Sequence, residues 1–369
     1  MKYYIIAGEA SGDLHGSNLI SELRKLDASA NIRCWGGDKM QEAGGDLVKH
    51  YRNLAFMGFA EVLINLKTIL KNLKFCKADI LGFKPDTLIL IDYPGFNLRI
   101  AKWAKQHGLK VIYYISPQVW AWKESRVKMM KECIDKMLVI LPFEKDYFKN
   151  KWNWNVEYVG HPLVEEIKKF KNQNPTPKFN DKPIIALLPG SRKQEIEKKI
   201  PVMLAVSSFF PDHQFIIAQA SAVENEFYEP FVQSYPNVSS VSNKTYELLM
   251  QSKAALVTSG TATLETALFG VPQVVCYKSS FFSYQLAKRL VKVKYIAMVN
   301  LIMGMPVVKE LIQNDLTVES LKHELHELLS NESRITRIKK DYTDLKHLLS
   351  QNDNASAKAA QSIFQFLTT

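Results

Sequence analysis

The sequence predicts an α/β protein of two Rossmann-like domains, each built on a parallel β-sheet with crossover helices. Short apolar runs alternate with helical patterns along most of the chain, as in repeated strand–helix–strand units. The alternation is interrupted at residues 171–183, which contain three prolines and no apolar periodicity. A chain of 369 residues is also too long for one ordinary core. We therefore expect a first domain at residues 1–170 and a second at residues 171–349.

The strands of the first domain are predicted from apolar runs that end in small or polar residues. The run at residues 4–6 stops at a glycine-rich loop that leads into a helical pattern. The run at residues 87–91 is apolar at nearly every position, which is typical of a strand buried on both faces. Further strands are expected at residues 32–36, 111–115 and 137–141.

The second domain repeats this alternation and is followed by charged helical sequence at residues 319–349. Residues 355–367 then show the apolar spacing of an amphipathic helix. We expect the C-terminal segment 350–369 to cross back and pack on the first domain. The strands of the second domain are expected at residues 184–188, 214–218, 254–258 and 273–277.

Charge and cysteine content limit the class of protein. The net charge of +11 favours anionic partners such as phosphorylated substrates or lipid surfaces. The charges are dispersed lysines rather than arginine-rich blocks, so no nucleic-acid partner is predicted. The four cysteines form no CxxC pair, which argues against a disulfide framework or a zinc site. We recognise no leader peptide or membrane-spanning stretch, and we expect a cytoplasmic protein.

The loop at residues 7–16 joins the first strand to a helix and carries Glu9, Ser11, Gly12 and Asp13. Open α/β sheets bind ligands outside the carboxyl ends of their strands, and the N–H groups at a helix start favour anions. The polar residues of this loop are therefore candidates for a binding site. The glycine spacing, G-x3-G-x3-G, differs from the dinucleotide fingerprint G-x-G-x-x-G.

Two further residues of the first domain have the chemistry of an active site. Asp92 directly follows the buried run at residues 87–91, where a carboxylate is a candidate general base. An Asx-turn with the following Pro-Gly pair is an equally common explanation. His161, between a glycine and a proline, is a candidate base, phosphate ligand or plain turn residue.

Two loops of the second domain suit a nucleoside diphosphate. Gly190, Ser191 and Arg192 follow a strand and begin a helix, where N–H groups, a hydroxyl and a guanidinium can bind phosphates. A capped helix with a solvated arginine is the alternative. The second loop carries small hydroxyl residues at a helix start, with a carboxylate for ribose hydroxyls further along, and a tightly packed helix with a salt bridge is its alternative. Its candidates are Ser259, Gly260, Thr261 and Glu265.

Asn300 lies in an apolar run, which makes it either a ligand-binding residue or an amide satisfied inside the core.

Residues 54–75 have the pattern of a basic amphipathic helix, because one helical face is apolar and another carries lysines. Phe56 and Met57 add apolar surface beyond what a buried stripe needs. This pattern suits a membrane interface or an acyl-chain site, and a helix packed on two sides is the alternative. The candidate contacts on the apolar face are Phe59, Leu63 and Leu66.

Taken together, these stretches resemble the lipid-A-disaccharide synthase family, bacterial glycosyltransferases of the GT-B architecture. The resemblance covers nearly the whole chain in order, and the string Ser-Pro-Gln-Val-Trp-Ala-Trp at residues 116–122 is its most specific part. It rests on residues 7–13, 56–58, 91–97, 114–122, 141–144, 159–161, 187–192, 259–261, 287–291 and 300–301.

The resemblance implies a reaction and assigns residues to it. UDP-2,3-diacylglucosamine is the donor, 2,3-diacylglucosamine 1-phosphate (lipid X) is the acceptor, and UDP leaves with inversion and without a metal or cofactor. The family's essential aspartate and arginine correspond to Asp92 and Arg192. Gly95 stands where many members carry an acidic residue, which leaves Asp92, or Asp13 from the first loop, as the base.

The resemblance also implies where the substrates bind. Glu9, Ser11, Gly12 and His161 would hold the acceptor sugar and its phosphate, and the second domain would hold UDP. The basic charge and residues 54–75 suit peripheral attachment to the inner membrane. A homodimer stays possible. The alternatives are a UDP-sugar 2-epimerase of the same architecture and a non-catalytic lipid- or nucleotide-binding protein.

Overall fold

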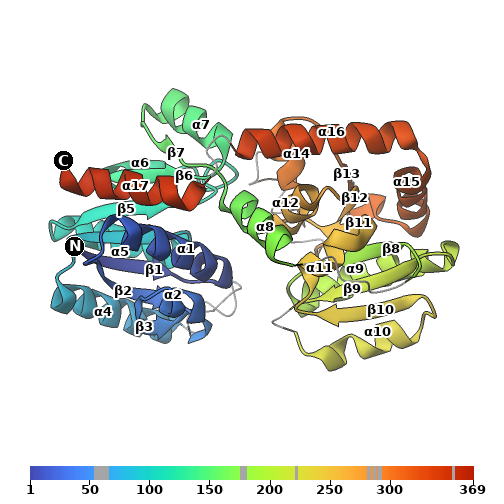
Figure 1. The fold of residues 1–369 in the computed structure, drawn as a ribbon, viewed down its shortest axis with the longest axis horizontal. Helices are drawn as coiled ribbons and strands as arrows, with labels where there is room; N and C mark the ends of the chain where they lie inside the picture. The colour runs from blue at the N-terminus through green and yellow to red at the C-terminus, as the bar shows by residue number, and fades with distance from the viewer. Residues whose placement is uncertain are drawn as a thin grey trace. The chain divides into compact units, whose positions relative to one another are not determined.

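The computed structural model describes residues 1–53, 66–174, 181–220, 223–280, 284–285, 289, 293–350 and 354–369. The chain forms two compact units: unit 1 is Met1–Pro162 with Ser350–Thr369, and unit 2 is Leu163–Leu349. Each unit contains one parallel sheet with helices packed on it (Figure 1). The predicted α/β class with two Rossmann-like domains is therefore confirmed.

Unit 1 ends at Pro162, before the boundary that the sequence predicts at residue 170. Helix α8 (Pro162–Gln173) begins at this point. The ring of Phe170 packs edge-on against Tyr246 and Phe269, with centroid distances of 5.2 and 6.4 Å. These aromatic contacts, with partners far along the chain, place the body of α8 in unit 2.

The sheet of unit 1 has seven parallel strands in the order β3-β2-β1-β4-β5-β6-β7. Its outer strands β3 and β7 are not among the expected strands, because they are too short or too exposed to show an apolar run. Strands β1 and β4 pair Ala7 with Ile91, so the loops that follow them leave the same edge of the sheet. The strands are β1 (Lys2–Ala7), β2 (Asn31–Gly36), β3 (Asp46–His50), β4 (Thr87–Ile91), β5 (Lys110–Tyr114), β6 (Lys136–Val139) and β7 (Glu157–Tyr158).

Helices cover both faces of this sheet, and the C-terminal helix α17 (Ala355–Thr368) lies beside α1 (Figure 1). Its residues Ala359, Ala360 and Ile363 are buried in the same apolar cluster as β1, and Lys358 Nζ donates a hydrogen bond to the carbonyl of Tyr158 (2.8 Å). The predicted return of the C-terminal helix to the first domain is confirmed. The other helices are α1 (Ala10–Leu26), α2 (Asp38–Glu42), α4 (Leu66–Phe83), α5 (Pro94–Gln106), α6 (Arg126–Cys133) and α7 (Pro142–Trp152).

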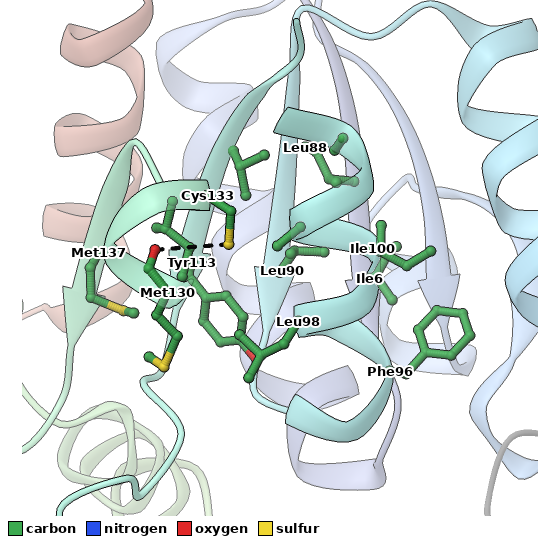
Figure 2. Packing of buried hydrophobic residues seen from close by; sticks show 14 of the residues in the cluster. Ile6, Leu88, Leu90, Phe96, Leu98, Ile100, Tyr113, Met130, Cys133 and Met137 are labelled. Atoms are coloured by element: carbon green, nitrogen blue, oxygen red, sulfur yellow. Dashed lines mark hydrogen bonds between the residues drawn. The ribbon is translucent and has the colours of Figure 1, made fainter. Parts of the chain in front are cut away.

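One core of unit 1 packs α5 and α6 against the sheet (Figure 2). Leu88 and Leu90 of β4 meet Leu98 and Ile100 of α5 and Tyr113 of β5, and all five are buried. Burial of each such aliphatic side chain contributes about 1.5–3 kcal/mol to folding. This core fixes the carboxyl ends of β4 and β5, from which the site described below extends.

The sheet of unit 2 has six parallel strands in the order β10-β9-β8-β11-β12-β13. Residues 175–180 of the expected linker lie outside the described residues. Its strands are β8 (Ile184–Leu188), β9 (Gln214–Gln219), β10 (Val238–Ser242), β11 (Ser252–Thr258), β12 (Gln273–Tyr277) and β13 (Lys309–Ile312). Its main helices besides α8 are α9 (Lys193–Ala205), α10 (Glu229–Gln233), α11 (Thr245–Gln251), α12 (Thr261–Phe269), α14 (Met298–Met303), α15 (Val318–Ser330) and α16 (Glu332–Leu349).

Candidate functional site

Left-handed backbone angles gather where β4 and β5 of unit 1 end. Asp92 and Tyr93 have φ angles of 44° and 48°, and Ile115 has a φ angle of 66°. Non-glycine residues seldom adopt this conformation, and a β-branched residue does so least. Such strain persists only where the surrounding structure enforces it, and it is frequent at active sites. The backbone thus marks the same sheet edge as the sequence motif at residues 91–97.

The main chain of Asp92 is held by hydrogen bonds. Its carbonyl oxygen accepts from Asn97 Nδ2 (2.8 Å) and Tyr113 Oη (2.6 Å), and its N–H donates to the carbonyl of Tyr114 (3.2 Å). Neither Asn97 nor Tyr113 is predicted as a site residue, although Asn97 is a buried amide inside the quoted motif. A buried amide in the helix that directly follows the candidate carboxylate is the signal that could have found Asn97.

The Asp92 carboxyl group has the properties of a general base. Burial, and next the repulsion from the Glu9 carboxylate, raise the pKa of Asp92 from 3.8 to about 6, and a hydrogen bond from the Tyr93 main chain opposes the rise. A group with this pKa is mostly ionised at pH 7 and is basic enough to accept a proton from a hydroxyl. The structure therefore brings together Glu9 and Asp92, which lie far apart in the sequence.

The loops that carry Glu9 and Asp92 pack closely, and this requires glycine at position 8. A Cβ atom on Gly8 would lie 2.2 Å from Cδ1 of Tyr93, which no side chain can accommodate without a shift of the ring. Gly12 is buried, and Ser11 is exposed in the first turn of α1. Ser11 is thus the hydroxyl of this loop that faces solvent.

Asp13, which is predicted from the sequence as an alternative general base, has a structural role in the folded chain. Its buried carboxylate accepts hydrogen bonds from the N–H groups of Gly37 (2.7 Å), Lys39 (3.2 Å) and Met40 (3.0 Å), and so it caps α2. Both carboxylate oxygens thus accept from backbone amides, and the side chain is held against the start of α2. This geometry argues against Asp13 as the general base and leaves Asp92.

Two buried histidines lie near this edge. Burial lowers the pKa of His15 to about 4, and burial with repulsion from His15 lowers the pKa of His161 to about 3. Both imidazoles are therefore neutral at pH 7. A neutral His161 can hydrogen-bond to a phosphate but adds no positive charge.

Glu144 is a buried carboxyl group of unit 1 that is not among the predicted site residues. It accepts hydrogen bonds from the Leu141 N–H (3.1 Å) and from Trp120 Nε1 (3.1 Å). Burial raises its pKa to about 8. The bond to Trp120 joins two motifs that are distant in the sequence, residues 116–122 and 141–144.

In unit 2, the structure places the two predicted phosphate loops side by side. Strands β8 and β11 are paired, with Leu188 opposite Val257, so both loops leave the same edge of the sheet. Gly190 and Gly260 have φ angles of 135° and 129°, which only glycine adopts without strain. This arrangement points the starts of α9 and α12 to one place and suits a diphosphate.

The side chains of these loops are largely open to solvent. Ser191 and Thr261 are exposed, and the Arg192 side chain is 56% exposed and pairs with Glu195 at 3.5 Å. Ser259 Oγ donates a hydrogen bond to the carbonyl of Ile296 (3.0 Å), which orients that hydroxyl. Arg192 can therefore exchange a solvated ion pair for an anionic ligand at little expense.

Two other predicted contacts of UDP have partners inside unit 2. Glu265 Oε1 accepts a hydrogen bond from Tyr246 Oη (3.0 Å), and burial raises the pKa of Glu265. Asn300 is 1% exposed, and its Nδ2 donates to the Val308 carbonyl and to Glu310 Oε1, each at 2.9 Å. Its Oδ1 accepts from the Val308 N–H (2.9 Å). Asn300 is thus a satisfied core amide, and its expected role as a direct UDP ligand is not supported by this geometry.

The predicted apolar contacts at residues 54–75, and the prediction that no metal is bound, can be compared with the structure only in part. Phe56, Met57, Phe59 and Leu63 lie outside the described residues, and the side chain of Leu66 is not described either. Further along α4, Leu70 and Phe75 are 54% and 48% exposed beside exposed lysines. Across the described ranges, no cluster of histidine, cysteine, aspartate and glutamate has the arrangement of a metal site.

Comparison with known proteins identifies the family. The family model described as Lipid-A-disaccharide synthetase matches residues 3–364. A lipid-A-disaccharide synthase of Syntrophus aciditrophicus is 36% identical over 97% of this chain and 96% of its own. The chain belongs to the lipid-A-disaccharide synthase family. Membership of this family makes it a glycosyltransferase and confirms the family resemblance that the sequence motifs indicate.

Solved structures share the fold of this lipid-A-disaccharide synthase family member. A kitacinnamycin glycosyltransferase superposes with a TM-score of 0.69 at 14% identity and covers 99% of both chains. A UDP-GlcNAc 2-epimerase of Neisseria meningitidis superposes with a TM-score of 0.64 at 12% identity, over 95% of this chain and all of its own. At such identities the likeness concerns the fold alone, so the epimerase gains no support as an activity.

Proposed function

We propose that the chain transfers the 2,3-diacylglucosaminyl group of UDP-2,3-diacylglucosamine to the 6-hydroxyl of lipid X. The observation that supports this most is the Asp92 carboxyl group, which is held in place with a raised pKa at the strand end where the family has its essential aspartate. A carboxylate of this kind is the base that an acceptor hydroxyl needs.

In the proposed reaction the acceptor oxygen attacks the anomeric carbon of the donor. The new C–O bond forms as the bond from this carbon to the β-phosphate oxygen breaks, and the configuration inverts. Asp92 accepts the hydroxyl proton, and UDP leaves with the electron pair of the broken bond. Ser11 and the N–H groups at the start of α1 are proposed to bind the acceptor and its phosphate.

The leaving UDP needs positive charge, and unit 2 is proposed to supply it. The exposed Arg192 guanidinium and the starts of α9 and α12 are the candidate groups. Donors that are already oriented toward developing negative charge stabilise it without reorganisation. Arg192, Ser191 and Thr261 are therefore the proposed contacts of the diphosphate.

The direct test is incubation of the purified chain with the donor, lipid X, or both. We expect disaccharide and UDP in equal amounts only when both substrates are present, measured by mass spectrometry and by a UDP assay. Epimerised UDP-GlcNAc without disaccharide would replace the proposal with the epimerase. Binding of UDP without any turnover would favour the non-catalytic protein.

We also propose that the chain attaches peripherally to an anionic membrane through residues 54–75. None of the described helices is long and apolar enough to cross a membrane. The part of α4 beyond residue 66 supports the proposal, because Leu70 is exposed and the flanking Lys67, Lys71 and Lys74 are exposed as well. Exposed apolar and basic side chains on one helix suit an anionic interface.

Replacement of Leu70 and Lys71 by serine is expected to weaken binding to anionic vesicles roughly tenfold, since an apolar contact and a charge are lost together. Co-sedimentation with phosphatidylglycerol vesicles measures this. The matched control replaces Leu26 and Lys25, an exposed pair on α1, which should leave sedimentation unchanged. Equal loss in both variants, or none in either, would contradict the proposal.

A further inference from the structure

Lys199 is a buried cation of α9 that neither the sequence motifs nor the proposed reaction uses. Its side chain is 2% exposed, although the neighbouring Lys198 is exposed. Positions 192, 195 and 199 lie three and four residues apart, so Arg192, Glu195 and Lys199 share one face of the helix start. A lysine at this spacing from the loop arginine is the pattern that could have identified it.

The ammonium group lies against both phosphate loops of unit 2. Lys199 Nζ donates a hydrogen bond to Oγ1 of Thr258, the last residue of β11. On the other side, a Cβ atom placed on Gly190 would lie 3.4 Å from the same nitrogen. Gly190 follows β8, and β8 pairs with β11. The Lys199 ammonium group therefore lies next to both loops, where these two strands end.

This position is electrostatically unfavourable for the folded chain alone. Burial lowers the pKa of Lys199, and the Glu195 carboxylate only partly offsets the effect. That carboxylate is also shared with Arg192, at 3.5 Å. Two cations therefore face one half-exposed carboxylate, which forms its ion pair with Arg192. A buried ammonium that is incompletely compensated lowers stability, so an apolar side chain of similar length would pack there more favourably.

The hydrogen bond to Thr258 also has a direction that matters for a ligand. A hydroxyl that accepts a hydrogen bond from an ammonium keeps its own proton for another acceptor. Thr258 stands at the carboxyl end of β11, directly before the second loop. A phosphate oxygen over this loop is the acceptor that fits, since it is anionic and prefers a hydroxyl donor.

We propose that Lys199 is a positioning residue for the diphosphate of a nucleoside-diphosphate sugar. Its ammonium orients the Thr258 hydroxyl toward a phosphate oxygen and adds positive charge between the two loops, beside Arg192. The inference rests on the proposed UDP site of unit 2 and adds to it the residue that couples the two loops.

The test measures UDP affinity by isothermal titration calorimetry and stability by thermal unfolding. Lys199→Met is expected to weaken UDP binding at least about tenfold, as for loss of a charged hydrogen-bonding group, while Tm stays the same or rises. Lys199→Gln, which keeps a donor for Thr258 but not the charge, should fall between. The exposed Lys198→Met is the matched control and should bind UDP like the parent chain.

Energetic coupling between Lys199 and Thr258 in UDP binding distinguishes a positioning role of Lys199 from a purely structural one. Thr258→Val should weaken UDP binding, and the Lys199→Met, Thr258→Val double variant should lose little more than the larger single loss. In turnover assays the KM for the donor should rise, and the KM for the acceptor should not.

The possible failures are distinguishable. If the parent chain does not bind UDP, the proposed donor site is wrong and the inference falls with it. If the parent binds UDP and Lys199→Met or Lys199→Gln binds equally well, the donor site stands and the positioning role is overturned. A lower Tm with unchanged UDP affinity would likewise assign Lys199 to stability alone.

Discussion

Asp92→Asn is expected to lower kcat by about 10²–10⁴-fold, the usual contribution of a positioned general base. The amide keeps the size of the carboxyl group but cannot accept the proton of the acceptor hydroxyl. The hydrogen bonds from Asn97 and Tyr113 reach its main chain, and an asparagine Oδ1 can still accept the hydrogen bond from the Tyr93 main chain, so the loop geometry should survive the replacement. Turnover is measured as disaccharide formed per enzyme under saturating substrates.

The control for Asp92→Asn is UDP affinity, which should stay within about threefold of the parent value because the proposed UDP contacts belong to unit 2. Asp13→Asn is the matched acidic variant. Asp13 caps α2, so Asp13→Asn should affect Tm more than it affects kcat. Full activity in Asp92→Asn, or an equally large loss of kcat in fully folded Asp13→Asn, would refute the assignment of the base.

The raised pKa of Asp92 also predicts a pH profile. The base works only when ionised, so kcat/KM should fall as the pH drops through about 6. Burial is the larger cause of this pKa and the Glu9 carboxylate is the next. Glu9→Gln removes the repulsion, which should move the acid limb to lower pH. A limb that stays in place would exclude Glu9 as a cause of the shift.

Arg192→Met is expected to lower kcat/KM by about 10²–10³-fold, the loss typical of removing one charged donor from a developing anion. The guanidinium is 56% exposed in the free chain and its ion pair with Glu195 lies at the surface, so its removal should change Tm very little. A large kinetic effect with unchanged stability would separate a binding role from a structural one. Steady-state kinetics with varied donor measure it.

Two further variants sharpen the Arg192 result. Arg192→Lys keeps the charge but loses the planar fork, so an intermediate loss is expected. The adjacent Lys193 is about as exposed, at 50%, and pairs with Glu224 at 2.6 Å, so Lys193→Met is the matched control and should keep near-parent kinetics. Equal losses at both positions would indicate a general charge effect and not a specific contact.

Much of the fold follows from local patterns in the sequence. The runs at residues 87–91 and 184–188 are apolar at nearly every position because both faces of a central parallel strand are buried, and the structure places β4 and β8 there. The outer strands β3 and β7 escaped prediction because an edge strand buries fewer side chains. The boundary at Pro162 escaped it because Phe170 finds its partners more than seventy residues away.

For the candidate site, too, some features follow from the sequence and others only from the folded structure. The sequence by itself determined the family, the two-sheet class and the loops after β1, β4, β8 and β11, because the carboxyl ends of parallel strands gather at one edge. Only the tertiary structure decided which polar groups in those loops stay available. In the folded chain the Asp13 carboxylate accepts hydrogen bonds from N–H groups at the start of α2, and the Asn300 amide has its hydrogen-bond partners within unit 2. The Asp92 carboxyl group has a raised pKa.

Lys199 is the sharpest case of this difference. In the sequence it is one lysine among many on a charged helix. In the folded chain its ammonium is buried between two loops from different strands. Residue type and spacing are local properties that a sequence displays, whereas burial, pKa and hydrogen-bond partners depend on segments brought together by folding. Chemistry that rests on a charge held out of water is therefore decided by the tertiary structure.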